Sequence, residues 1–169
     1  MWQQRFNIQA LSTGHPSILE TANLAWTGEA DSAATAERLA AHTGIRRAFI
    51  ELHGTLGAGK TTFVRHLLQA LGVQGRIKSP TYAVMEPYEL PGFNAWHFDF
   101  YRFNDPQEWE DAGFRDIFAA DGLKLAEWPD KAHGLLPVPD LRIAIAIGDN
   151  ELRHVSMAAL TPVGQELLR

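Results

Sequence analysis

The stretch that decides the fold is Ala48 to Leu71, which reads AFIELHGTLGAGKTTFVRHLLQAL. Its first residues are largely apolar over the length of a strand, and this run ends at Gly54. After Lys60 the apolar residues recur at helical spacing until Gly72, a common residue just past a helix end. These helical positions are Phe63, Val64, Leu67, Leu68 and Leu71. The stretch therefore predicts a strand, a glycine-rich turn and a helix, in that order.

The turn itself, GTLGAGKT from Gly54 to Thr61, matches the pattern G-x-x-x-x-G-K-[ST] of a phosphate-binding P-loop. Glycines are needed because the loop turns with positive φ and its amides must approach phosphate oxygens closely. In this pattern Lys60 supplies a cation for the β- and γ-phosphates, the Thr61 hydroxyl is a Mg²⁺ ligand, and Thr62 is next in line for a phosphate. The predicted ATP-binding residues here are Gly54, Gly57, Ala58, Gly59, Lys60, Thr61 and Thr62.

The rest of the chain extends this unit into an α/β domain. Residues 1–24 show no sustained period and are interpreted as an N-terminal extension of unknown role, and residues 25–169 as one P-loop domain. Further helices are expected at 31–42 and 105–113, and further strands at 81–88, 95–100, 123–127, 141–147 and 154–158. We predict a single-domain P-loop NTPase fold of class α/β. Its mixed sheet has a parallel core and antiparallel C-terminal strands, flanked by helices.

Composition limits the classes of function. The 169 residues carry 15 Lys plus Arg against 20 Asp plus Glu, a net charge of -5, which argues against nucleic acid as the sole partner. The chain has no Cys, so disulfides, thiolate nucleophiles and Cys-ligated zinc are excluded. Apolar runs such as 143–147 are far shorter than the roughly 20 residues of a membrane helix, and the start lacks a secretion signal. We therefore expect a cytoplasmic protein without a membrane partner.

A P-loop enzyme also needs a carboxylate at the end of a neighbouring strand to hold Mg²⁺ or to orient the attacking water. Asp99 and Glu127 each end a predicted buried strand, so both are expected at the edge of the sheet beside the loop. His97, inside an apolar strand, is interpreted as a hydrogen-bonded core residue. The Asn-Lys-x-Asp string by which GTPases recognise guanine is absent, which favours ATP.

Several strings together resemble one family, the TsaE (YjeE) proteins, over about Thr27 to Pro137. They are GTLGAGKTT (54–62), KSPTY (78–82), EPY (86–88), HFDFYR (97–102) and LAEWP (125–129). The P-loop alone is generic, but the other strings in this order and at these distances are specific. The resemblance implies a Mg²⁺-dependent ATPase needed for threonylcarbamoyladenosine formation in bacterial tRNA. It also implies work in a complex with the TsaD and TsaB proteins, tRNA contact only through that complex, and weak hydrolysis without partners.

The resemblance also implies roles for single residues. Thr61 and Glu127 become the metal ligands, Lys60 and Asp99 the catalytic pair, with Asp99 orienting or activating water. Ser79, Thr81 and Tyr82 resemble a switch-like loop facing the γ-phosphate, Trp128 lies beside the site, and Arg153 is a looser match near the nucleotide base.

Two other classes of function stay open on the residues alone. One is a P-loop kinase for a small molecule, which suits the length but needs an arginine-bearing lid, and Arg102 and Arg115 are the only arginines between Lys78 and Arg142. The other is a binding scaffold whose affinity for protein partners is controlled by ATP or ADP.

Overall fold

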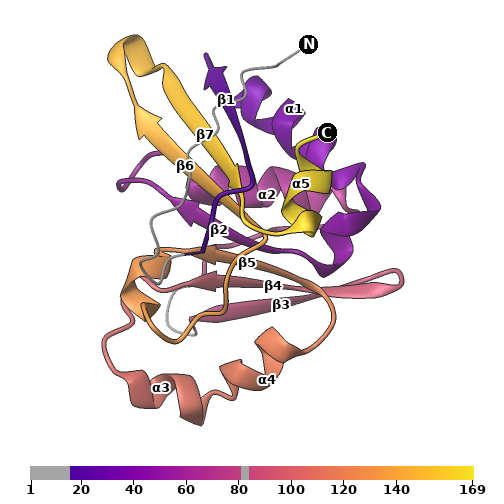
Figure 1. The fold of residues 1–169 in the computed structure, drawn as a ribbon, viewed down its shortest axis with the longest axis vertical. Coiled ribbons are helices and arrows are strands. Elements are labelled where there is room, and N and C mark those ends of the chain that lie inside the picture. Colours follow the sequence, from indigo (N-terminus) through magenta and orange to yellow (C-terminus); the bar gives the residue numbers. More distant parts are fainter. Residues whose placement is uncertain (1–15, 81–83) are drawn as a thin grey trace.

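The computed structural model describes residues 16–80 and 84–169, which form a seven-stranded sheet with helices packed against it (Figure 1). The strands are β1 (Glu20–Trp26), β2 (Phe49–His53), β3 (Met85–Leu90), β4 (Phe93–Asp99), β5 (Leu123–Glu127), β6 (Leu141–Ile147) and β7 (Arg153–Ala159). The α-helices are α1 (Glu29–Ala40), α2 (Lys60–Ala70), α3 (Pro106–Asp111), α4 (Phe114–Ala119) and α5 (Pro162–Leu167). Short 3-10 turns cover Thr43–Arg47, Pro129–Ala132 and Asp149–Glu151.

The strand order is β1-β7-β6-β2-β5-β4-β3. The four central strands, β6, β2, β5 and β4, run parallel to one another. The pairs β1–β7, β6–β7 and β3–β4 are antiparallel, so antiparallel pairing occurs at both ends of the sheet rather than only in its C-terminal part. The predicted mixed α/β fold is confirmed. Its parallel core brings the carboxyl ends of β2, β4, β5 and β6 to one edge, where α/β sheets bind their ligands.

Two apolar clusters fill the two faces of the sheet. On one face, residues of α1 and α2 such as Leu39 and Leu67 pack on inward residues of β2 such as Ile50. On the other face, α3 and α4 contribute aromatic side chains to a cluster around Phe98. Its aromatic members are Phe49, Phe98, Phe100, Phe103, Trp109 and Phe114. Each buried aromatic side chain contributes about 1.5–3 kcal/mol of hydrophobic stabilisation, so both faces hold the central strands firmly.

The N-terminal boundary predicted at residue 24 is wrong, because residues 20–24 belong to the sheet. Strand β1 pairs with β7 along its whole length, from Glu20 opposite Ala159 to Trp26 opposite Arg153. It is an edge strand whose alternate side chains face solvent, and its inward residues Ala22 and Leu24 are too few to show a clear period of two. Residues 1–15 lie outside the described part of the chain.

Smaller differences concern helices. Helix α1 begins at Glu29, two residues before the predicted start, because Gly28 is its N-cap. Asp31, the predicted first residue, lies inside the helix and accepts hydrogen bonds from the Thr27 backbone N–H (2.7 Å) and hydroxyl (2.8 Å). Helices α4 and α5 have six residues each and were not expected.

Within residues 16–80 and 84–169, no helix combines the length and the apolar character needed to cross a bilayer.

Candidate functional site

The glycine-rich loop that matches the P-loop pattern connects the end of β2 to the first turn of α2, as the sequence predicts. Gly54 has φ +151°, and a Cβ placed there would lie 2.6 Å from the Ile145 carbonyl oxygen and 3.0 Å from the Ala58 Cβ. Gly59, the N-cap of α2, is left-handed with φ +107°. A side chain at either position would strain the turn, so glycine is required for this path of the backbone. Gly57 and Ala58 complete the loop, and Thr62 lies in the first turn of α2.

Lys60 is folded back over its own loop. The residue is only 5% exposed. Its Nζ atom donates to the carbonyl oxygens of Gly54 (2.6 Å) and Thr55 (3.0 Å). The same Nζ lies 4.2 Å from the ring centroid of Trp128, a cation–π distance. Burial lowers the pKa of Lys60 below its ordinary value, while the charges of Glu127 and Asp99 act in the opposite direction. The loop thus holds a desolvated cation at its centre.

Thr61 and Glu127 form a second contact at the same edge. The Thr61 hydroxyl lies 2.9 Å from both carboxylate oxygens of Glu127, the last residue of β5, which is 2% exposed. Mg²⁺ in proteins takes one or two such oxygen ligands, and phosphates and water supply the rest. A hydroxyl and a carboxylate side by side beside a phosphate loop fit this donor set. Within the described residues, no group of three or more His, Cys, Asp or Glu side chains could hold a metal ion.

Asp99 ends β4 directly opposite Glu127 in the parallel register. Its carboxylate accepts hydrogen bonds from the Ser79 hydroxyl (3.1 Å) and the Tyr101 backbone N–H (3.0 Å). Burial raises the pKa of Asp99, and the nearby Glu127 charge adds to this effect, against the two hydrogen bonds, which lower it. Ser79, predicted in a switch-like loop, therefore touches the second site carboxylate. Thr81 and Tyr82, predicted in the same loop, lie outside the described residues.

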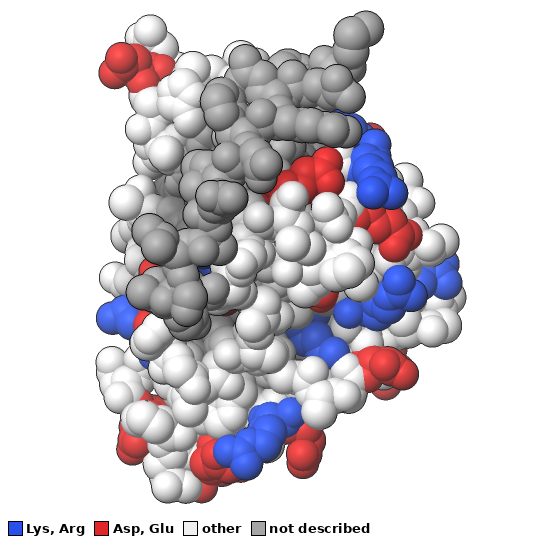
Figure 2. Space-filling model, viewed as in Figure 1, with Lys and Arg blue, Asp and Glu red and all other residues white. Residues whose placement is uncertain are grey.

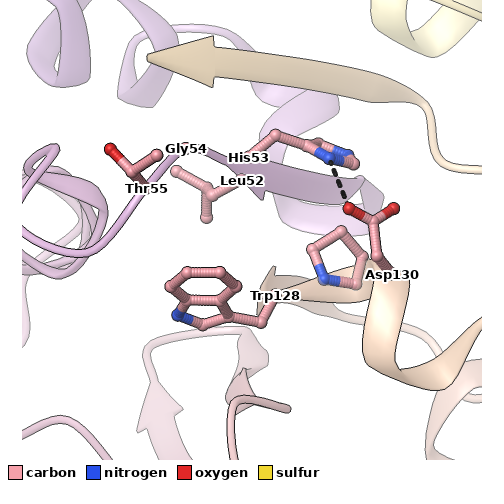
Figure 3. A pocket seen from close by; sticks show the side chains of 7 residues that line it. Leu52, His53, Gly54, Thr55, Trp128 and Asp130 are labelled. Carbon is pink, nitrogen blue, oxygen red and sulfur yellow. Dashed lines mark ion pairs between the residues drawn. The ribbon is translucent and has the colours of Figure 1, made fainter. Parts of the chain in front are cut away.

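Trp128 lies beside the loop, with its ring next to the Lys60 ammonium. It adopts a left-handed backbone conformation (φ 54°, ψ 47°), and its ring lies 5.0 Å from that of Tyr101. A cavity of about 280 Å³ lies beside the start of the loop. Figure 3 shows the Trp128 ring among the side chains that line it. The cavity is lined by Leu52, His53, Gly54, Thr55, Trp128, Pro129 and Asp130.

Arg153, the first residue of β7, reaches the loop from the other side. Its Nε donates to the carbonyl oxygen of Ala58 at 3.1 Å. The structure therefore brings the loosest of the predicted site residues into direct contact with the loop backbone.

The contact of His97 with Glu127 was not predicted. His97 is fully buried and hydrogen-bonded, as expected of a core residue, but its Nε2 lies 2.9 Å from Oε1 of Glu127. The available signal was its position two residues before Asp99, because side chains two apart on a strand share a face.

Comparisons with known proteins show which family and fold this chain resembles. The family model described as "Threonylcarbamoyl adenosine biosynthesis protein TsaE" matches residues 26–155. The chain is 43% identical over 119 residues to the tRNA threonylcarbamoyladenosine biosynthesis protein TsaE of Haemophilus influenzae, covering 70% of this chain and 75% of that protein. It is 33% identical over 111 residues to the protein of the same name from Bacillus subtilis, covering 66% and 69%. The crystal structure of Bacillus subtilis YdiB has the same fold, with a TM-score of 0.72 at 24% identity, over 88% of this chain and 92% of that one.

Proposed function

The chain belongs to the TsaE family, which takes part in tRNA threonylcarbamoyladenosine biosynthesis, and from this premise we propose that it is a Mg²⁺-dependent ATPase serving that modification. The observation that carries the proposal is the convergence of Lys60, Thr61, Asp99 and Glu127 on one glycine loop at the carboxyl edge of the sheet. A cation, a hydroxyl and two carboxylates beside loop amides are the parts that phosphoryl transfer to water requires.

The proposed chemistry depends mainly on positioning and electrostatics. The loop amides and the N-terminus of α2 bind the phosphates, and Lys60 neutralises charge that develops on the γ-phosphoryl group. Thr61 and Glu127 would hold Mg²⁺, which would supply positive charge to offset that of the phosphates. Asp99 orients the attacking water and accepts its proton, and its raised pKa makes it a better base than an ordinary aspartate.

We further propose that hydrolysis supports a complex with the TsaD and TsaB proteins in the cytoplasm, and that tRNA is met only through that complex. Two observations support the second part. The net charge is -5, and Figure 2 shows Lys and Arg side chains interspersed with Asp and Glu over the face in view, without a continuous basic field. A phosphate backbone is attracted by clustered positive charge, which this face does not offer.

The test measures phosphate release from ATP with Mg²⁺, first with the chain alone and then with TsaD and TsaB added together. We expect slow release by the chain alone and a clear increase with the two proteins. A panel of small hydroxylated acceptors is run in parallel. Phosphorylated acceptor without free phosphate would instead identify a kinase. Nucleotide-dependent binding to the two proteins without any phosphate release would identify a scaffold.

A further inference from the structure

His97 is a buried residue whose contact the proposed chemistry does not yet use. It lies in β4 with no exposed surface, and its Nε2 is 2.9 Å from Oε1 of Glu127 on the neighbouring strand. Because residues 97 and 99 share one face of β4, the ring lies on the same side of the sheet as Asp99. The histidine therefore contacts, from the neighbouring strand, the carboxylate that we assign to the metal.

The surroundings of the ring determine which nitrogen carries the proton. Among the described residues, Nδ1 of His97 is buried without a hydrogen-bond partner. If Nδ1 were protonated, a buried N–H would lack an acceptor and the lone pair of Nε2 would face a carboxylate oxygen. Both effects are unfavourable. We therefore infer that Nε2 carries a proton and donates it in a hydrogen bond to Glu127.

Glu127 is consequently held from two directions. The Thr61 hydroxyl contacts both of its oxygens at 2.9 Å, whereas His97 engages Oε1 alone. A carboxylate with one oxygen fixed by a rigid, buried donor cannot rotate freely about its last bond. Such supporting hydrogen bonds orient metal ligands, and their loss typically weakens metal affinity by about 10–100-fold.

We propose that His97 is a positioning residue, whose Nε2–H fixes the Glu127 carboxylate beside the Thr61 hydroxyl and so prepares the site for Mg²⁺. This inference rests on the proposed function, because it concerns the same metal. His97 makes no contact with the reacting atoms, and its effect passes through Glu127. It predicts a defect in the use of Mg²⁺ rather than in the binding of nucleotide.

The first experiment titrates Mg²⁺ against phosphate release at saturating ATP in full-length variants. His97→Leu removes the donor, and His97→Gln keeps an N–H group at a similar reach. We expect the Mg²⁺ concentration for half-maximal release to rise about tenfold or more for His97→Leu and less than about threefold for His97→Gln. ATP affinity in EDTA should stay within about twofold of wild type for both, since no metal ligand is used there. His66→Leu is the matched control and should behave as wild type, because His66 on α2 makes a similar contact (3.0 Å) with a carboxylate outside the site, that of Glu29 on α1.

The second readout does not depend on activity. Nitrogen-15 spectra of the histidine rings, recorded without nucleotide or metal, should show His97 protonated at Nε2, and Glu127→Gln should shift that signal. Protonation at Nδ1 would overturn the proposal, as would a folded His97→Leu variant with the Mg²⁺ dependence of wild type. If His97→Leu does not fold, His97→Gln and the spectra decide. Wild-type protein that shows no response to Mg²⁺ would refute the proposed function instead, and the ring spectra would still test the contact with Glu127.

Discussion

Replacing Lys60 with methionine removes a charge while keeping most of the side-chain volume, so it separates binding from stability. The buried ammonium donates to two loop carbonyls and lies over Trp128, and all of these contacts are lost. Burial, however, lowers the pKa of Lys60, which means that the folded protein holds this proton less tightly than the unfolded chain. Stability from this group is highest above the unfolded pKa and is lost as the pH falls through the folded pKa. At neutral pH we therefore expect Lys60→Met to unfold at a temperature equal to or above that of wild type.

The binding of ATP should change in the opposite direction. An ammonium that bridges two phosphates makes charge-assisted hydrogen bonds of about 1.5–3 kcal/mol each, or roughly 3–6 kcal/mol for two. Part of this gain is offset, because Lys60 must give up or share its bonds to Gly54 and Thr55. A net loss of about 3 kcal/mol remains for the variant, which corresponds to roughly 150-fold weaker binding.

Lys124 is the matched control for this experiment. It too is 5% exposed, burial likewise lowers its pKa, and its Nζ lies 5.5 Å from the ring centroid of Trp96. It donates to the Ala120 carbonyl oxygen, on the face of the sheet opposite the loop. Titration calorimetry with Mg²⁺ and a non-hydrolysable ATP analogue should give wild-type affinity for Lys124→Met. The reasoning is refuted if the two methionine variants weaken binding equally, or if Lys60→Met weakens it less than about fivefold.

Three further perturbations follow from single contacts. Burial raises the pKa of Asp99, so the acid loss of ATPase activity should occur at a higher pH than an ordinary aspartate with a pKa of about 4 would cause. A carboxyl group with a raised pKa loses its contribution to stability as the pH rises, so Asp99→Asn should also unfold at a higher temperature than wild type at neutral pH. It should lose most of its turnover. Thermal melts check the first effect and pH–rate profiles the second. Gly164→Ala places a Cβ 1.8 Å from the Asp140 carbonyl oxygen, so urea unfolding should show a loss of about 1–3 kcal/mol despite the better helix propensity of alanine. Arg153→Ala removes the bond to Ala58 and should weaken ATP binding roughly fivefold, from about 1 kcal/mol, with unchanged binding as the contrary result.

The parts of the fold that local pattern specifies could be predicted from the sequence. The span 123–127 was expected as a strand and is β5, and the strand, loop and helix around Gly54 appear in the expected order. Period and glycine chemistry act within a few residues, so one sequence is enough to show them. The pattern did not reveal strand β1, because half of its side chains face solvent. It did not reveal α4 and α5, because six residues span less than two helical turns.

The candidate site was predictable to the extent that it depends on strand ends. Asp99 and Glu127 were expected at one edge, and the register of β4 and β5 places them opposite one another. The roles assigned to them remain predictions. The bond from His97 to Glu127 could not be read from the chain, because it depends on which strands are neighbours and on a diagonal contact across them.

The contacts within this edge also indicate how nucleotide would change the protein. Lys60 donates to two loop carbonyls, and the Thr61 hydroxyl contacts both oxygens of Glu127, so these two side chains already have partners within the protein. Because Lys60 and Glu127 are ionised groups, these bonds are themselves charge-assisted, and the binding of phosphate and metal would exchange one set of charge-assisted contacts for another. His97 differs, because it is fully buried in β4 and contacts Oε1 of Glu127 alone. On the role that we propose for it, the histidine keeps the Glu127 carboxylate oriented while the contacts of Thr61 and Lys60 change.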